Sequence, residues 1–243
     1  FSSLAAALIL APLSGLVALS ETRARRPERI GTAFLRGARI AATLALIPLL
    51  ILSANAIFVQ NCDYGAGLFF YLMGPTLSIL FASQVGVMCA LLHRRTWVAY
   101  GSFVGVLLLW FGADLWHLYH EPPIFAYNAF VGFFSGAIYD DVITIESPFL
   151  ALRAANLLQL GVLWTVAAGL YDATRGTLNW GGVRTLTGRT WAMLAVWVIG
   201  LSAIQGASGP LGYEVSRETI AKRLGGKVSD DRVTLYYDRE RIS

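Results

Sequence analysis

The chain has 243 residues, of which 56% are hydrophobic and only 14% are charged, and its mean hydropathy is +0.59. These values exclude a typical soluble domain as the main body of the chain. The net charge of +4 does not indicate nucleic-acid binding, because the basic residues lie in short loops between apolar runs. A helix that crosses a bilayer needs roughly 20 apolar residues, and several stretches reach that length. The composition therefore predicts an all-α membrane protein.

Six stretches are predicted to span the membrane as a helix bundle that occupies residues 1–207. The spans are residues 3–20, 40–60, 68–92, 97–118, 152–172 and 190–207. Pro48 and Pro75 lie inside spans and predict kinks there. The first stretch has no initiator Met, no basic segment before it and no cleavage site after it, so we interpret it as a span rather than a signal peptide. We expect the sequence to be a fragment of a longer polypeptide.

The basic residues predict how the bundle is oriented. The three loops after the first, third and fifth spans hold eleven of the nineteen Lys and Arg residues, whereas residues 61–67 and 119–151 have none. Short cytoplasmic loops are enriched in Lys and Arg. We therefore expect the three basic loops to be cytoplasmic, and the 61–67 loop, the 119–151 segment and the C-terminal tail to face outward. Four arginines of the first loop are predicted to contact anionic lipid headgroups as well: Arg23, Arg25, Arg26 and Arg29.

A polar cluster lies at the outer end of the fourth span. Asp114, His117, His120 and Glu121 fall within an arc of about 120° on a helix. These side chains could ligate a divalent metal, form a proton relay or ligate a pigment. The interpretation that we favour is an interfacial cluster that bonds to the outer loop, because Asp114 is only about one turn from the end of the span and the spacing matches no specific metal motif.

The outer loop, residues 119–151, is unusually aromatic. Its stretch "PPIFAYNAFVGFFSGAIYDD" is apolar but too interrupted by Gly and Pro to be a span. Aromatic rings concentrate at the membrane interface. We expect this loop to lie on the bilayer or to dip into the helix bundle, where its backbone must find protein partners. Asp140 and Asp141 could add to a cation site or be solvated.

Small and polar residues inside the spans predict helix contacts. Gly101 and Gly105 form a GxxxG pattern that permits close helix packing. The polar residues Asn55, Gln84, Asn156, Gln159 and Gln205 are expected to hydrogen-bond to neighbouring helices. Asp172 and Arg175 are three residues apart and could form an ion pair. No phosphate-binding or nucleophile motif is present, so no catalytic residue is assigned.

The tail, residues 208–243, has a different, short α/β pattern. Ser216 can cap a helix that runs to about Leu224, and Gly225 and Gly226 supply a stop. The stretch "RVTLYY" is typical of a strand, and no partner strand is evident elsewhere in the chain. We therefore expect the tail to begin a soluble extracytoplasmic domain that continues past Ser243, or to pair with another subunit.

Three stretches carry a family resemblance: "NCDYGAGLFFYLMGPTLS", "HEPPIFAYNAFVGFFSGAIYDD" and "RVTLYYDRERIS". Together they resemble uncharacterised bacterial multi-span membrane proteins whose spans precede a peptidase-MA-like (gluzincin) extracytoplasmic domain. The resemblance covers the spans and implies that the final strand is the first strand of that domain. The zinc motif of the family has no counterpart in this chain, so the resemblance transfers no catalytic residue.

The leading hypothesis is a non-catalytic membrane domain. It would anchor an extracytoplasmic domain, or act as a structural subunit of a larger membrane complex, with membrane lipids and other subunits as partners. A second hypothesis is an accessory subunit of a photosynthetic or electron-transfer complex, in which His117 or His120 ligates a pigment or haem. A third is a small transporter or channel lined by Gln84, Asn156 and Gln159, although no inverted repeat is evident.

Overall fold

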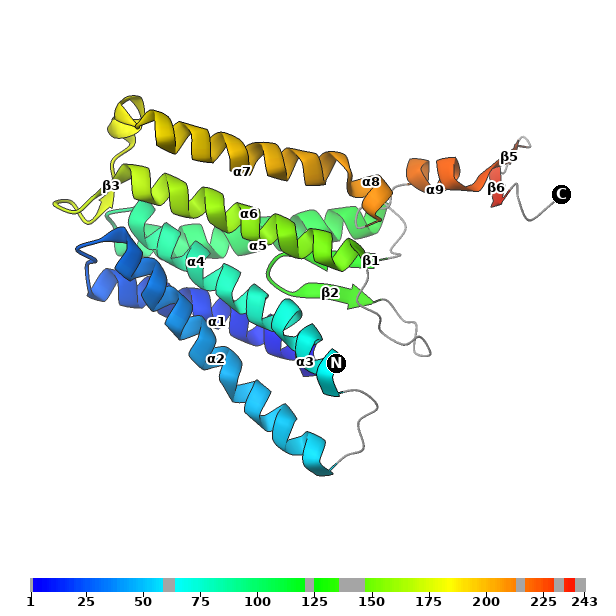
Figure 1. Cartoon of the computed structure of the whole chain (residues 1–243), viewed down its shortest axis with the longest axis horizontal. Coiled ribbons are helices and arrows are strands. Elements are labelled where there is room, and N and C mark those ends of the chain that lie inside the picture. The colour runs from blue at the N-terminus through cyan, green and yellow to red at the C-terminus, as the bar shows by residue number, and fades with distance from the viewer. Residues whose placement is uncertain are drawn as a thin grey trace.

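The computed structural model describes residues 2–58, 64–120, 125–135, 147–212, 217–229 and 234–238. This part of the chain is mostly helical, and the longer helices pack side by side into a bundle (Figure 1). The helices are α1 (Ser2–Ala24), α2 (Ile30–Phe58), α3 (Tyr64–Tyr71), α4 (Leu77–Leu92), α5 (Thr96–His120), α6 (Ser147–Leu170), α7 (Gly188–Gly206), α8 (Ser208–Leu211) and α9 (Arg217–Leu224), with a π-helical turn η1 (Leu72–Thr76) and a 3-10 turn η2 (Trp180–Thr185). The strands form three antiparallel pairs, β1 (Phe125–Asn128) with β2 (Gly132–Ser135), β3 (Tyr171–Asp172) with β4 (Thr177–Leu178), and β5 (Gly225–Ser229) with β6 (Thr234–Asp238).

Five helical segments in the described residues are long and apolar enough to cross a membrane. They are Ala6–Ala24, Ile30–Phe58, Tyr64–Leu92, Thr96–Trp116 and Ser147–Leu170. They correspond to the first five predicted spans, and α7, the sixth, is not among them. Helix α2 begins at Ile30 rather than at residue 40, because Arg36 and Arg39 are good helix formers and extend the helix beyond its apolar part.

Helix α4 forms the centre of the bundle. In an 18-residue stretch of Tyr64–Leu92, 78% of the residues are buried inside the protein, whereas only 11% are buried in the equivalent stretches of α2 and α5. The sequence of α4 is apolar on every side, which is typical of a helix surrounded by other helices. Its buried residues Phe81, Ala82 and Val85 belong to a core that also includes Phe103 of α5 and Ala45 of α2.

The closest helix crossing brings α1 against α4 at two glycines. A Cβ atom built on Gly86 would lie 2.1 Å from the carbonyl oxygen of Gly15. Gly101 and Gly105 do not lie at such a crossing in the described structure, where a Cβ atom built on either residue meets nothing within 4 Å. Helix packing at this GxxxG pattern stays a prediction.

The α-helical geometry of the third span is interrupted at Pro75, where the sequence predicted a kink. Proline has no N–H to donate to the preceding turn, and the chain forms the π-helical turn η1 there. The Thr76 hydroxyl donates to the carbonyl oxygen of Tyr71 at 3.2 Å, which satisfies the acceptor that Pro75 leaves free. Helix α2 continues through Pro48 to Phe58.

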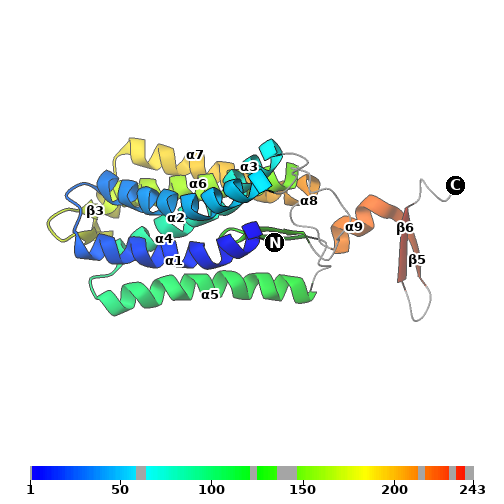
Figure 2. The same ribbon diagram turned by 90° about the horizontal axis from the view of Figure 1, so that it is seen from below.

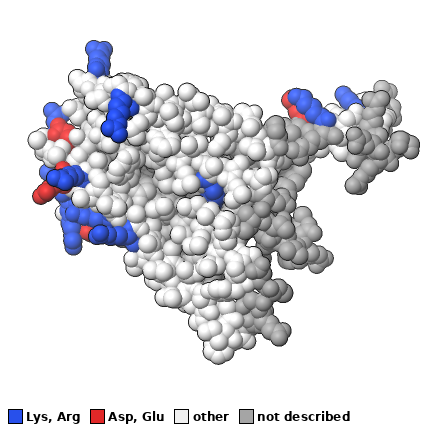
Figure 3. Space-filling model, viewed as in Figure 1, with Lys and Arg blue, Asp and Glu red and all other residues white. Residues whose placement is uncertain are grey.

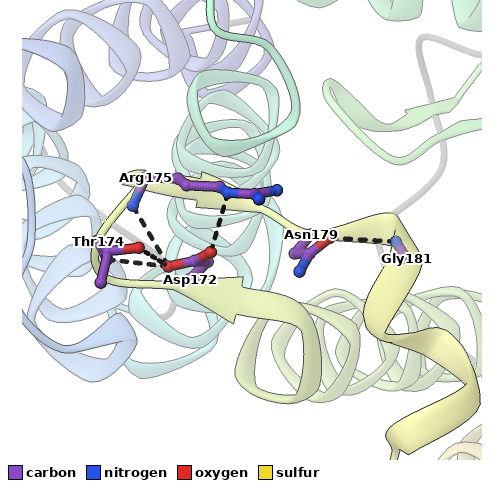
Figure 4. A network of polar contacts seen from close by, with 5 residues as sticks. All are labelled: Asp172, Thr174, Arg175, Asn179 and Gly181. Carbon is purple, nitrogen blue, oxygen red and sulfur yellow. Dashed lines mark hydrogen bonds and ion pairs between the residues drawn. The ribbon is translucent and has the colours of Figure 1, made fainter.

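A polar network closes the turn between α6 and α7 (Figure 4). Asp172 Oδ1 accepts hydrogen bonds from the Thr174 hydroxyl at 2.5 Å and from the Thr174 backbone N–H at 2.9 Å. Arg175 Nε lies 3.3 Å from Asp172 Oδ2, which confirms the predicted ion pair. The Thr174 hydroxyl, followed by backbone N–H groups and Arg175, holds the pKa of Asp172 below its ordinary value. Asn179 accepts from Gly181 N–H at 3.2 Å and caps η2.

The prediction that the last strand lacks a partner in this chain is wrong. Strand β6 pairs with β5, and Gly226 lies opposite Tyr237 in the register. Gly225 and Gly226 were interpreted as a helix stop, but they also begin β5. The positive φ of 67° at Gly225 lets the chain leave α9 and enter the strand directly. The ring of Tyr237 covers Gly226, where a Cβ atom would lie 2.6 Å from the ring.

Candidate functional site

The described part of the aromatic loop is a β-hairpin that enters the helix bundle. The turn between β1 and β2 carries Phe130, whose side chain is fully buried in the core. Its ring makes edge contacts with Phe81 of α4 at 5.2 Å and with Trp110 of α5 at 5.6 Å between centroids. The turn of this hairpin therefore packs in the core of the bundle, and the placement of the loop as a whole stays a prediction.

Asn128 and Asp114 connect this hairpin to α5. The Asn128 side-chain oxygen accepts hydrogen bonds from the backbone N–H groups of Phe130 at 2.7 Å and Val131 at 3.0 Å, so it organises the turn. Its side-chain amide donates to Asp114 Oδ2. A carboxylate that accepts a hydrogen bond is a strong partner for a buried amide. This contact agrees with the interpretation that the polar cluster of the fourth span bonds to the loop.

Of the other members of that cluster, only the His120 side chain belongs to the described residues. His120 Nδ1 lies 2.9 Å from the Trp116 carbonyl oxygen, and its ring stacks on Trp116 at 4.0 Å. Glu121 and the side chain of His117 lie outside the described part, as do Asp140 and Asp141. Among the described residues, no group of three or more His, Cys, Asp or Glu could hold a metal ion. The metal and pigment sites stay predictions.

A buried arginine that the sequence analysis missed lies beside the hairpin. Arg153 is in the second turn of α6, and only 2% of its surface is exposed. Its guanidinium donates to the Gly74 carbonyl oxygen at 2.8 Å, to the Ser78 hydroxyl at 3.1 Å and to Asn156 Oδ1 at 3.0 Å. The signal was available in the sequence, because Arg153 is a charged residue near the start of an otherwise uncharged span, and such residues usually have a role.

Neutral groups compensate the charge of Arg153 in the described structure. Ion pairs there join Glu21 to Arg25 and Asp172 to Arg175, and none reaches Arg153. The Phe149 ring lies 5.4 Å from the guanidinium carbon, a cation–π distance. The Nε atom of Arg153 is buried and has no hydrogen-bond partner among the residues that the structure describes. Three neutral acceptors and one aromatic ring thus replace the water that a guanidinium would otherwise bind.

Gly132 allows the hairpin to lie directly against Arg153. A Cβ atom built on Gly132 would be 2.6 Å from Arg153 Nη2, and the φ angle of 95° is one that other residues rarely adopt. Arg153 therefore connects α6 both to η1 and to the hairpin. Because a guanidinium does not release its proton in proteins, this arrangement can hold helices or an anion in place but cannot perform acid–base catalysis.

At the other end of the bundle, Arg23 joins three helices. Its guanidinium donates to the carbonyl oxygens of Ala90 at 3.4 Å and His93 at 2.6 Å, to that of Arg94, and to the Thr96 hydroxyl at 3.1 Å. The carbonyl oxygens lie at and just past the end of α4, where backbone C=O groups lack helical partners, and the Thr96 hydroxyl lies at the start of α5. Of the arginines predicted to contact lipid, Arg23 thus has protein partners that the sequence did not reveal, and Arg25 pairs with Glu21 at 3.1 Å. Lipid contact by Arg23, Arg25, Arg26 and Arg29 stays a prediction.

The polar residues of the transporter hypothesis divide into two groups. Asn156 donates to Gln159 Oε1 at 3.3 Å and accepts from Arg153. Gln84 instead donates to the Phe34 carbonyl oxygen at 3.3 Å. Gln84 of α4 thus contacts α2, whereas the hydrogen bonds that join Asn156 to Gln159 and Arg153 lie within α6.

Replacement of Asn128 by alanine is expected to lower the free energy of unfolding by about 2 kcal/mol, because the backbone N–H groups of Phe130 and Val131 lose their acceptor and Asp114 loses one hydrogen bond. Thermal unfolding in detergent would measure the loss, and proteolysis should cut the hairpin faster. Thr185→Ala is the matched control, since its exposed hydroxyl bonds only within its own turn. Equal stability of the Asn128 and Thr185 variants would contradict the role given to Asn128.

Comparison with known proteins returned no match. No family model matches the sequence, and neither a curated protein nor a solved structure of significant similarity was found. The resemblance to membrane proteins that carry a peptidase-MA-like domain therefore stays a prediction. The function is inferred from the arrangement of the helices, the charges and the tail.

Proposed function

We propose that this chain is a six-span, non-catalytic membrane domain that anchors an extracytoplasmic segment in the cytoplasmic membrane of a bacterium. The observation that carries the proposal is the placement of the tail. Helix α9 and the β5–β6 hairpin leave the bundle at the end opposite to the turns that join α1 to α2, α4 to α5 and α6 to α7 (Figures 1 and 2). Those three turns contain the arginine-rich loops.

The distribution of charge supports this orientation. Lys and Arg side chains gather at one end of the bundle, a broad and nearly uncharged surface follows, and charged groups return on the tail (Figure 3). An uncharged band between two charged ends is the pattern that a bilayer requires. Since short basic loops stay in the cytoplasm, the arginine-rich end faces the cytoplasm and the tail faces outward.

Helix α7 serves as the sixth span in this proposal. It has 19 residues, which gives a length of about 28 Å at 1.5 Å per residue, close to the roughly 30 Å thickness of the hydrocarbon core. It runs alongside α6 (Figures 1 and 2), and Trp197 Nε1 donates to the Thr165 hydroxyl at 3.0 Å. The ring of Trp197 lies over Gly161, where a Cβ atom would be 2.8 Å from it. The apolar side chains of Val196 and Ile199 are exposed and suit contact with lipid.

The internal polar contacts support an anchoring role. Arg23, Asp114 and Arg153 each join segments that are distant in the sequence. Such contacts hold a bundle in one arrangement, which suits a domain that positions another one. The family resemblance would make the anchored part a peptidase-like domain. A structural subunit of a larger complex would use the same contacts.

Cysteine accessibility tests the orientation. In a background with Cys62→Ser and Cys89→Ala, Ser229→Cys on β5 should react with a membrane-impermeant maleimide in intact cells. Arg95→Cys, in the turn between α4 and α5, should react only after permeabilisation. Labelling of both sites from the same side would show that α7 does not cross, and labelling of only Arg95→Cys in intact cells would reverse the orientation. Either outcome overturns the proposal.

A further inference from the structure

A small groove opens between α1 and α2 near the arginine-rich end of the bundle. Its volume is about 270 Å³. The residues that line it are Val17, Ser20 and Glu21 of α1, and Arg36, Arg39 and Ile40 of α2. The two helices therefore contribute walls of different chemistry, because α1 supplies a carboxylate and a hydroxyl and α2 supplies two guanidinium groups.

The groove lies at the level where both helices leave the apolar part of the membrane. Helix α1 has no charged residue before Glu21. In α2, Arg39 immediately precedes a stretch without charged residues that runs from Ile40 to Phe58. That stretch measures about 28 Å at 1.5 Å per residue, which matches the roughly 30 Å thickness of the hydrocarbon core. The groove is therefore placed at the depth of phospholipid headgroups.

The α2 wall of the groove presents hydrogen-bond donors. Arg36 Nη1 donates to the Arg25 carbonyl oxygen at 3.0 Å, which uses one of the five N–H donors of its guanidinium. Arg39 is exposed, and its guanidinium makes no ion pair or hydrogen bond within the part of the chain that the structure describes. The two arginines are three residues apart and share one face of the helix. Guanidinium groups in this arrangement can hold a phosphate group.

The α1 wall presents hydrogen-bond acceptors. The Ser20 hydroxyl donates its proton to the Val17 carbonyl oxygen at 2.8 Å, so its oxygen is left to accept. Glu21 Oε1 lies 3.1 Å from Arg25 Nε, but a carboxylate can accept several hydrogen bonds. A ligand with a phosphate alone would bring a second negative charge close to Glu21. A ligand that suits both walls carries a phosphate and, beside it, a cation that donates hydrogen bonds.

We propose that this groove binds the headgroup of phosphatidylethanolamine, with the phosphate between the two arginines of α2 and the primary ammonium group beside Glu21 and Ser20. This headgroup carries both charges that the walls require. Phosphatidylglycerol would leave Glu21 without a cation, and phosphatidylcholine has no N–H group to donate. The proposal requires that α1 and α2 cross the membrane, but it does not depend on the anchoring role or on the direction of insertion.

The surface beside the groove suits the acyl chains of such a lipid. Val17 and Ile40 line the end of the groove that points toward the apolar parts of α1 and α2. Leu13 lies one turn further along α1, and Ile47 lies two turns further along α2, each on the same face of its helix. Both side chains are exposed. An acyl chain can therefore continue from the headgroup along an apolar surface.

Three phospholipids with the same two oleoyl chains test which headgroup is recognised. Native mass spectrometry of the delipidated protein in detergent would measure the affinities for the ethanolamine, choline and glycerol headgroups. We expect one phosphatidylethanolamine per chain, bound about threefold to fivefold more tightly than either of the other two lipids, which is the size expected for one exposed ion pair. Equal affinity for phosphatidylethanolamine and phosphatidylcholine would overturn the proposal, because the N–H groups would then contribute nothing. Tighter binding of phosphatidylglycerol would indicate a basic surface for anionic lipids and would overturn it as well.

Four variants assign the two walls. Glu21→Ala removes the carboxylate and should reduce the ratio of the phosphatidylethanolamine and phosphatidylcholine affinities to about one, whereas Arg25→Ala breaks the ion pair outside the groove and should not reduce it. Arg39→Ala removes an exposed side chain and should weaken both lipids about fivefold at an unchanged ratio. Arg189→Ala, at an exposed arginine at the start of α7, should change neither affinity. A preference that survives Glu21→Ala, or affinities that Arg39→Ala leaves unchanged, would place the lipid elsewhere and reject this site.

Discussion

Arg153→Ala is expected to lower the free energy of unfolding by about 3 kcal/mol. The substitution leaves the Gly74 carbonyl, the Ser78 hydroxyl and the Asn156 amide without their donor, and each lost partner of a buried polar group costs about 1–3 kcal/mol. It also opens a cavity between α6 and η1. Removing a buried charge is itself favourable. The expected loss in the free energy of unfolding is therefore smaller than the summed costs of the lost hydrogen bonds and the cavity. Thermal or denaturant unfolding in detergent would measure it.

Two further variants make this result specific. Arg189→Ala changes an exposed arginine at the start of α7 and should alter stability by no more than about 0.5 kcal/mol. Arg153→Lys keeps the positive charge but replaces the planar fork by a single ammonium group, so it should recover only part of the loss. If Arg153→Ala were as stable as the wild-type protein, the buried guanidinium would not brace the hairpin and η1.

Gly86→Ala is expected to destabilise the protein by about 3 kcal/mol, at the upper end of the usual cost of overpacking. The added methyl group would lie 2.1 Å from the Gly15 carbonyl oxygen, and a backbone atom cannot move aside as a flexible side chain does. Helices α1 and α4 would have to separate, which loosens the centre of the bundle. The melting temperature in detergent, compared with that of the wild-type protein, would measure the effect.

Gly105→Ala is the matched control for this prediction. It makes the same chemical change in another membrane helix, where the new Cβ atom meets nothing within 4 Å. It should leave stability unchanged or raise it by up to about 1 kcal/mol, because alanine favours a helix more than glycine does. A stable Gly86→Ala variant, or an equal loss in both variants, would show that the α1–α4 crossing is not as close as described.

Local features of the fold could be predicted from the sequence. The ion pair between Asp172 and Arg175 follows from two opposite charges three residues apart, and the disturbance at Pro75 follows from the missing N–H. The partner of the last strand was missed because Gly225 and Gly226 are poor strand formers by composition. In the structure Tyr237 covers Gly226, and this cross-strand contact compensates for the missing side chain.

The candidate site was predicted only in part. Asp114 was selected because an acidic residue near the end of an apolar helix needs a partner, and its contact with Asn128 lies within the segment expected to supply one. Arg153 was missed, although it is the most deeply buried charged side chain described. Its position near a predicted span boundary made it resemble an interfacial residue, and nothing in the neighbouring sequence reveals that Gly74 and Ser78 surround it.

The sequence by itself determined the class of protein, since apolar length and the placement of arginines depend only on composition along the chain. The tertiary structure alone decided which residues meet. Gly15 meets Gly86, Arg153 meets Gly74 and Ser78, and Gln84 meets the Phe34 carbonyl oxygen. Each of these contacts joins positions from different helices. Many helix pairings would satisfy the same apolar pattern, because lipid solvates one apolar face as well as another, and only close packing and buried hydrogen bonds select among them.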